Sequence, residues 1–210
     1  MHSEVQREKN SIHSYIEVLF PSYSNQTLKE YSKTITENNK RLIGVISLGS
    51  YANVTENLDW VNTLGQDLKN FVIEKNIPFL GICFSHQLFA WIYGARVDFV
   101  EERENLPEKK YNEFRKIKVL DSKLKSIIDT NEFISKAKHE QEVKNIPNEH
   151  LELTITSEHC KIEGLTHKIY PAFSIQTHPE EFHESKQGWI FMKKFIGYFI
   201  SNSIATDDTK

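Results

Sequence analysis

The sequence predicts an α/β fold in which a mainly parallel, open sheet is covered by helices on both faces. The short apolar runs Leu42–Ser47 and Pro78–Cys83 have the composition of strands that are buried on both sides. Between them, the apolar residues of 58–75 recur at helical spacing, which indicates a helix with its apolar face turned inward. Strands that alternate with amphipathic helices are typical of a parallel sheet.

The other elements are expected from the same two periodicities. Gly94 is suited to end a helix that follows Cys83, and the charged stretch 101–113 is expected to be an exposed excursion. In the C-terminal helix, Trp189, Met192, Phe195, Ile196, Phe199 and Ile200 are expected to share one buried side. The remaining expectations are a helix over 3–14, a strand over Tyr15–Phe20 ended by Pro21, a polar helix over Asn25–Asn38, a helix over Phe84–Tyr93, and strands over Lys116–Leu120, Leu151–Thr156 and Tyr170–Gln176.

Length and composition limit the classes of protein that are compatible with this chain. Its 210 residues, taken as 1–210, fit one domain, and a mean hydropathy of -0.50 indicates a soluble protein. The net charge of -3 and the absence of a basic stripe argue against a nucleic-acid partner. No run approaches the roughly 18 apolar residues that a membrane span requires, and the first residues do not resemble a signal peptide. Two cysteines make no disulfide framework, so we expect a cytoplasmic protein.

The most informative segment surrounds Cys83. The buried strand before it runs into a helix with almost no loop, and small residues stand two positions before it (Gly81) and two after it (Ser85). This is the spacing of a nucleophile elbow, a tight strand-to-helix turn that exposes a reactive side chain. A helix N-terminus also favours the thiolate form of a cysteine. A buried structural cysteine is the alternative.

Gly81-Ile82-Cys83-Phe84-Ser85-His86-Gln87 resembles the nucleophile motif of class I glutamine amidotransferases, Gly-x-Cys-x-Gly-His-Gln. Ser85 is the one departure, and because serine is small we expect the elbow to survive it and to accept glycine as well. The resemblance implies the flavodoxin-like fold of that family. It also implies that Gln87 contributes to substrate binding and that His86 supports the elbow and does not act as the base.

A second motif of the same family follows the last apolar strand, as His178-Pro179-Glu180. The resemblance implies a triad in which His178 accepts the thiol proton of Cys83 and Glu180 orients the imidazole. These are the ordinary roles of a general base and of its orienting carboxylate.

Further segments extend the resemblance to about residues 42–200. Ile46–Tyr51 resembles the glycine-containing loop after a central strand, which implies an oxyanion hole made by the N–H groups of Gly49 and Phe84. Asn57–Trp60 and the segment from His139 to Pro147 also have counterparts in the family.

Two features depart from the family. The strand with which it opens is missing here or displaced, because 3–14 is expected to be helical. Arg115 stands where the family has glycine, and it could recognise a substrate carboxylate.

The resemblance implies a glutaminase that releases ammonia through a thioester on Cys83, with glutamine or a γ-glutamyl compound as substrate. A separate synthetase subunit would receive the ammonia. No cofactor is expected, and no histidine or cysteine spacing predicts a metal site. The alternatives are a stand-alone γ-glutamyl hydrolase or peptidase and a catalytically silent regulatory subunit. Cys160 is expected to be a buried, unreactive thiol.

Overall fold

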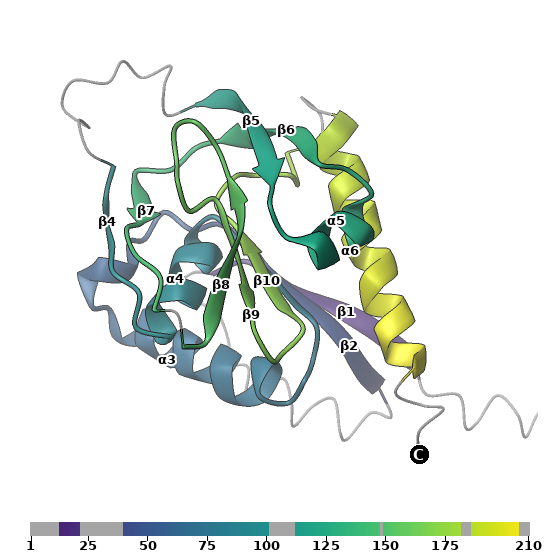
Figure 1. Cartoon of the computed structure of the whole chain (residues 1–210). Helices are drawn as coiled ribbons and strands as arrows, with labels where there is room; N and C mark the ends of the chain where they lie inside the picture. Colours follow the sequence, from purple (N-terminus) through teal and green to yellow (C-terminus); the bar gives the residue numbers. More distant parts are fainter. Residues whose placement is uncertain (1–12, 22–39, 101–111, 148, 182–185, 206–210) are drawn as a thin grey trace, which may run out of the picture.

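The computed structural model describes residues 13–21, 40–100, 112–147, 149–181 and 186–205, and a single eight-stranded sheet runs through its middle (Figure 1). The strand order is β1-β2-β3-β10-β9-β8-β5-β6. Its strands are β1 (His13–Leu19), β2 (Lys40–Ser47), β3 (Phe79–Ile82), β5 (Glu113–Val119), β6 (Glu132–Ala137), β8 (Leu151–Thr156), β9 (Gly164–His167) and β10 (Ala172–Ile175). A separate antiparallel pair joins β4 (Val97–Phe99) to β7 (Gln141–Val143).

The sheet has a parallel half and an antiparallel half, and β10 is the strand where they meet. The neighbours β1–β2, β2–β3 and β3–β10 are parallel. From β10 outward, the pairs with β9, β8, β5 and β6 are antiparallel. The carboxyl ends of the parallel strands therefore lie at one edge, and β3 and β10 end there side by side.

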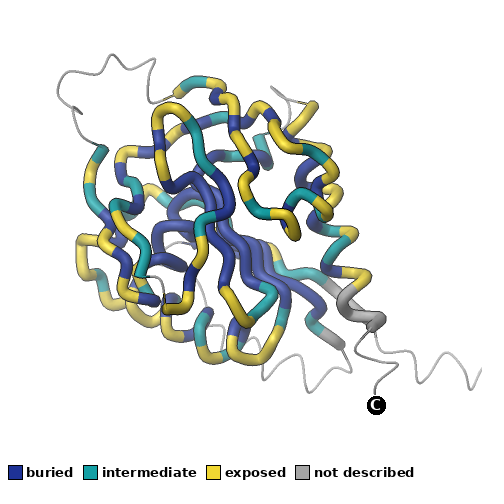
Figure 2. Tube along the Cα trace, viewed as in Figure 1, coloured by how far each residue is buried: buried dark blue, intermediate teal, exposed yellow. Residues whose placement is uncertain are grey.

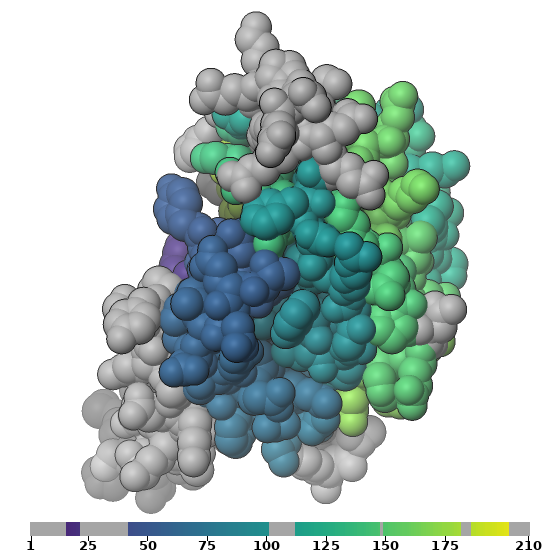
Figure 3. All heavy atoms as spheres, turned by 90° about the vertical axis from the view of Figure 1, so that its left-hand side faces the viewer, coloured from purple at the N-terminus to yellow at the C-terminus, as the bar shows by residue number. Residues whose placement is uncertain are grey.

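Helices cover both faces of the sheet. They are the 3₁₀ turn η1 (Val54–Glu56), α3 (Asp59–Asp67), the π-helical η2 (Leu68–Ile73), α4 (Phe84–Ile92), α5 (Ser122–Ile128) and α6 (Lys186–Ala205). α3, η2 and α4 form one layer, whereas α5 and α6 form the other (Figure 1). On the face shown in Figure 3, the blue segment with α3 and η2 lies beside the teal segment with α4 and β4.

The alternation of side chains along the central strands explains why each layer has its own core. Val45 and Phe79 pack with α3, η2 and α4, while their neighbours Ile46 and Leu80 pack with α5 and α6. The central strands are consequently the most deeply buried part of the chain (Figure 2).

Most of the expected elements are present. The α/β class, the helices on both faces and the strands and helices expected from 42 to 100 are confirmed. The strand expected over Tyr15–Phe20 is β1, paired in parallel with β2, so the parallel half begins before the strand of Leu42–Ser47. The expected helix over 3–14 is wrong at His13 and Ser14, which already belong to β1, and its remainder lies outside the described residues. The expected helix over 25–38 and most of the excursion 101–113 also lie outside them.

The prediction of which residues form the buried side of the C-terminal helix, α6, is partly wrong. Met192, Phe195 and Phe199 are buried, but Trp189 and Ile200 are each 44% exposed. Phe191 is buried in their place, because it stacks on Phe133 of β6 with 5.0 Å between the ring centroids. In the described part of the chain, no helix is long and apolar enough to cross a membrane.

Candidate active site

Cys83 occupies the corner between β3 and α4 with no loop residue on either side. Its φ of 53° and ψ of -106° are values that a non-glycine residue rarely adopts. The Cys83 N–H donates to the Ile175 carbonyl of β10 over 2.9 Å, which ties the corner to the neighbouring strand. A β-carbon on Gly81 would lie 2.8 Å from the Ser85 carbonyl oxygen, so the turn requires glycine there. The geometry is that of a nucleophile elbow.

His86 locks α4 onto the sheet from inside the protein. The side chain is fully buried, its Nε2 donates to the Ile162 carbonyl at 3.2 Å, and its Nδ1 accepts from the Ser174 hydroxyl at 2.9 Å. Burial lowers the pKa of His86 to about 3, with the bond to Ile162 acting in the opposite direction. A neutral imidazole with both nitrogens engaged in this way supports the elbow.

His178 and Glu180 follow the carboxyl end of β10, next to the end of β3. The His178 N–H donates to the Lys136 carbonyl over 2.7 Å, and Nδ1 of its ring lies 2.7 Å from Oε1 of Glu180. Burial alone would lower the pKa of His178. The nearby Cys83 and Glu180 side chains, of which Glu180 is hydrogen-bonded to Nδ1, outweigh burial and raise that pKa to about 11. The sequence-predicted base and nucleophile therefore follow the carboxyl ends of two neighbouring parallel strands, and in the structure the thiol lies 3.7 Å from the Lys138 carbonyl oxygen.

Gly49 brings the loop after β2 against these two side chains. A β-carbon at this position would lie 3.1 Å from Cε1 of His178 and 4.0 Å from the sulfur of Cys83. The absence of a side chain at Gly49 leaves room beside both groups. Phe84 is the first residue of α4, so its N–H is one of the amides that a helix leaves without an intrahelical acceptor.

The side chain of Gln176 was not identified from the sequence, and it lies directly beside the thiol. Its Nε2 is 3.8 Å from the sulfur of Cys83, and its Oε1 accepts from Nε2 of Gln87 at 3.3 Å. Nε2 of Gln87 also donates to the Gln141 carbonyl at 2.7 Å. Gln87 is thus buried beneath the site and joined to the thiol through Gln176. The sequence feature that could have identified Gln176 is its position at the end of the apolar run 170–176.

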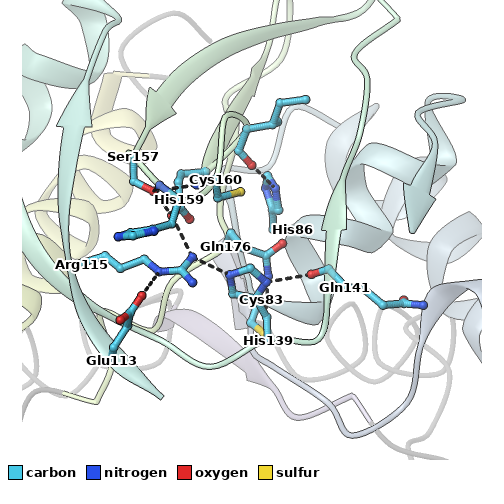
Figure 4. Close-up of polar contacts among 12 residues, drawn as sticks. Cys83, His86, Glu113, Arg115, His139, Gln141, Ser157, His159, Cys160 and Gln176 are labelled. Carbon is cyan, nitrogen blue, oxygen red and sulfur yellow. Dashed lines mark hydrogen bonds and ion pairs between the residues drawn. The ribbon is translucent and has the colours of Figure 1, made fainter. Parts of the chain in front are cut away.

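A buried ionic cluster adjoins the site on β5, where Arg115 replaces the family's glycine (Figure 4). Its Nε is 3.1 Å from Oε1 of Glu113, and Nη1 is 3.5 Å from Oε1 of Glu163. Nη1 also lies 3.1 Å from Nε2 of His139, whose Nδ1 donates to the Gln141 carbonyl. Only 8% of Arg115 is exposed. Two acidic side chains, the buried Glu163 and the partly exposed Glu113, therefore accompany the guanidinium.

Cys160 lies apart from Cys83 and is buried. Burial and the negative charge of Glu163 raise the pKa of its thiol well above the ordinary range, which keeps the thiol protonated. In the described part of the chain, no three His, Cys, Asp or Glu side chains gather as a potential metal site.

Comparisons with known proteins agree on one family. The glutamine amidotransferase class-I family matches residues 9–197. The glutamine-hydrolyzing subunit of GMP synthase from Methanococcus vannielii is 33% identical over 133 residues, which are 63% of this chain and 66% of that protein. The protein of the same name from Thermoplasma acidophilum is 30% identical over 158 residues, or 74% of this chain and 72% of that one. The chain spans only 52% to 66% of the length of the first relatives it matches.

Solved structures show the same fold. A crystal structure of a T. acidophilum protein, assigned to the same GMP synthase subunit, superimposes with a TM-score of 0.66 at 23% identity, covering 94% of this chain and 98% of that one. A glutamine amidotransferase of Thermotoga maritima gives a TM-score of 0.59 at 17% identity over 94% of this chain and 86% of that one. Together with the family match, which spans most of the sequence, they lead to one conclusion: this chain belongs to the class-I glutamine amidotransferases.

Proposed function

We propose that this protein hydrolyses the side-chain amide of glutamine, with Cys83 as nucleophile, His178 as base and Glu180 as the group that orients it. The observation that supports the proposal is the elbow at Cys83, which stands at the sheet edge where Glu180 lies 2.7 Å from the His178 imidazole. A thiol, a base and an orienting carboxylate in this arrangement are the parts of an activated nucleophile.

The reaction proceeds in two balanced halves. His178, whose pKa is raised, takes the proton of the Cys83 thiol before the sulfur attacks the amide carbon, and the same proton then leaves on ammonia as the thioester forms. Water attacks the thioester in the second half, with His178 taking its proton and returning it to the departing sulfur, which frees glutamate. The negative oxygen formed in each half would accept hydrogen bonds from the Gly49 and Phe84 N–H groups.

Substrate identity follows from the charges around the pocket. Arg115 was the feature that favoured a larger γ-glutamyl substrate, yet the buried Glu163 and the partly exposed Glu113 already accompany its guanidinium. A buried ion pair of this kind has little attraction left for a third carboxylate. Glutamine itself is therefore the favoured substrate. Gln87 contributes to its binding through Gln176 and Gln141, with which it shares its hydrogen bonds.

The names of the relatives suggest where the ammonia goes. Because the two relatives described above are glutamine-hydrolyzing subunits of GMP synthase, we propose that the partner of this chain is a separate synthetase subunit. Such a synthetase would consume the ammonia before it reaches solvent.

The test is steady-state ammonia release by the purified chain, comparing kcat/KM for glutamine with that for a γ-glutamyl dipeptide. We expect glutamine to be preferred, Cys83→Ala to abolish release, and Cys160→Ala, the matched control, to keep it. Preference for the dipeptide would establish the hydrolase alternative. Slow release that a synthetase partner does not accelerate would favour the silent regulatory role.

A further inference from the structure

Ser85 stands in the first turn of α4, at the one position where the nucleophile motif departs from the family, and its hydroxyl makes two short hydrogen bonds. The residue is fully buried. Its Oγ donates to the Leu48 carbonyl at 2.7 Å, and Oγ of Ser47 lies 2.7 Å away on its other side. Because the single proton of Ser85 is given to Leu48, the Ser47 hydroxyl must be the donor of the second bond. The hydroxyl thus joins the elbow to the end of β2.

The bond to Leu48 acts on the peptide that carries a proposed oxyanion donor. The Leu48 carbonyl and the Gly49 N–H belong to one planar peptide, and in a trans peptide they point in opposite directions. Fixing the carbonyl therefore fixes the direction of the N–H. The preceding amide is fixed as well, since the Leu48 N–H donates to the Leu19 carbonyl of β1 at 3.0 Å.

Glycine at position 49 makes such a restraint necessary. Glycine adopts many backbone conformations at little cost, so the peptide on its amino side could rotate if nothing held it. The same residue lies against the sulfur of Cys83 and the ring of His178, where a substrate carbonyl would react. A donor that must reorient during the reaction loses much of its benefit, because preorganisation is the source of oxyanion stabilisation.

We propose that Ser85 is a positioning residue that sets the Leu48–Gly49 peptide in the orientation required of an oxyanion donor. The bond also polarises that peptide, which strengthens its N–H as a donor. This inference rests on the proposed function, because the oxyanion arises only if Cys83 attacks an amide. It revises the expectation that glycine would serve equally well at position 85, since glycine would leave the buried Leu48 carbonyl without this donor.

The experiment compares Ser85→Ala with Ser47→Ala in the full chain. Removing an oxyanion donor outright costs about 100- to 1000-fold in kcat, so loosening one is expected to cost Ser85→Ala about tenfold or more, with KM within about twofold. Alkylation of Cys83 by iodoacetamide forms no oxyanion and should keep its rate. Ser47→Ala removes the neighbouring hydroxyl but leaves the bond from Ser85 to Leu48, so its loss of kcat should stay within about threefold.

A second readout does not depend on activity. Hydrogen exchange of the Gly49 amide, followed by NMR, should accelerate in Ser85→Ala and not in Ser47→Ala. Faster exchange in Ser85→Ala, together with no ammonia release by the unaltered protein, would show that Ser85 holds the Leu48–Gly49 peptide but would overturn the proposed function, and with it the oxyanion role of that peptide. Unchanged kcat and unchanged exchange in Ser85→Ala would overturn the role of Ser85, as would a loss of alkylation as large as the loss of kcat. Ser85→Gly serves as the second variant should the alanine protein fail to fold.

Discussion

Nδ1 of His178 lies 2.7 Å from Oε1 of Glu180, although only Pro179 separates the two residues in the chain. A bond from the Glu181 N–H to the His178 carbonyl closes the turn that makes this contact possible. Because Nδ1 donates to the carboxylate, Nε2 is the nitrogen left to face the thiol. The short motif therefore sets the orientation of the imidazole.

Replacing Glu180 by glutamine should lower the pKa of His178 from its value of about 11. The change removes a negative charge but keeps the shape of the side chain. A hydrogen bond to a charged group contributes about 1.5–3 kcal/mol, so kcat for glutamine should fall roughly 10- to 100-fold. NMR titration of the His178 ring reports the pKa separately from the rate. An unchanged titration in Glu180→Gln would mean that the carboxylate does not act on this imidazole.

Gln176→Met should slow both glutamine hydrolysis and the alkylation of Cys83. Methionine fills similar space but removes the amide N–H that lies 3.8 Å from the sulfur, and with it a donor that stabilises the thiolate. One such bond is worth about 1.5–3 kcal/mol when the acceptor is charged. The pH dependence of iodoacetamide labelling is the measurement. Gln141→Met is the control, because its side-chain amide contacts Thr55 and not the sulfur. Equal effects of the two variants would argue against a role for Gln176 at the thiol.

Only Cys83 should react with an alkylating reagent in the folded protein. Cys160 is buried and its pKa is raised by burial and by Glu163, so it lacks the thiolate that reacts. Peptide mapping after a short exposure to iodoacetamide measures both sites at once, and the same treatment in urea should label both. Comparable labelling of the two thiols in the folded chain would contradict the assignment of Cys83 as the nucleophile.

Acid should destabilise the protein partly through His86. Its pKa is about 3 when folded and near 6.5 when the chain is unfolded. Between these values the unfolded state binds the extra proton, so the free energy of unfolding falls as pH drops below about 6.5, by about 1.4 kcal/mol per pH unit for this group. Urea midpoints at a series of pH values give the slope. His86→Gln should show a shallower slope whatever its absolute stability, and parallel slopes would show that folding does not lower the pKa of His86.

The parts of the site that the sequence predicts are those whose neighbours are close in the chain. The corner at Cys83 needs only the residues around it, and Glu180 reaches His178 through a single intervening residue. The amide of Gln176, by contrast, reaches the thiol only because β10 pairs beside β3. The order of strands in the sheet cannot be derived from the residues on either side of Gln176 in the sequence. Arg115 was recognised as unusual, but its burial between Glu113 and Glu163 depends on the antiparallel half of the sheet.

The same distinction holds for the fold. β2, β3 and β10 are continuous apolar runs and were predicted, since strands buried on both faces carry that signature. β9 and β7 were not, because their sequences, Gly-Leu-Thr-His and Gln-Glu-Val, form no apolar run and are too short to display a period. α5 was not predicted either, because its seven residues make barely two turns, too few to display an amphipathic pattern clearly.

The pairing of β3 with β10 also governs when the site can exist during synthesis. Phe79 opposes Ala172 across that pair, so the ribosome must release nearly the whole sheet before the two strands can meet. Closing so long a segment is slow compared with local helix formation. A nascent chain that already displays Cys83 has no His178 to activate it. Under the proposed function, unfinished copies of this protein should therefore be unable to hydrolyse glutamine, and the appearance of that activity should report completed folding.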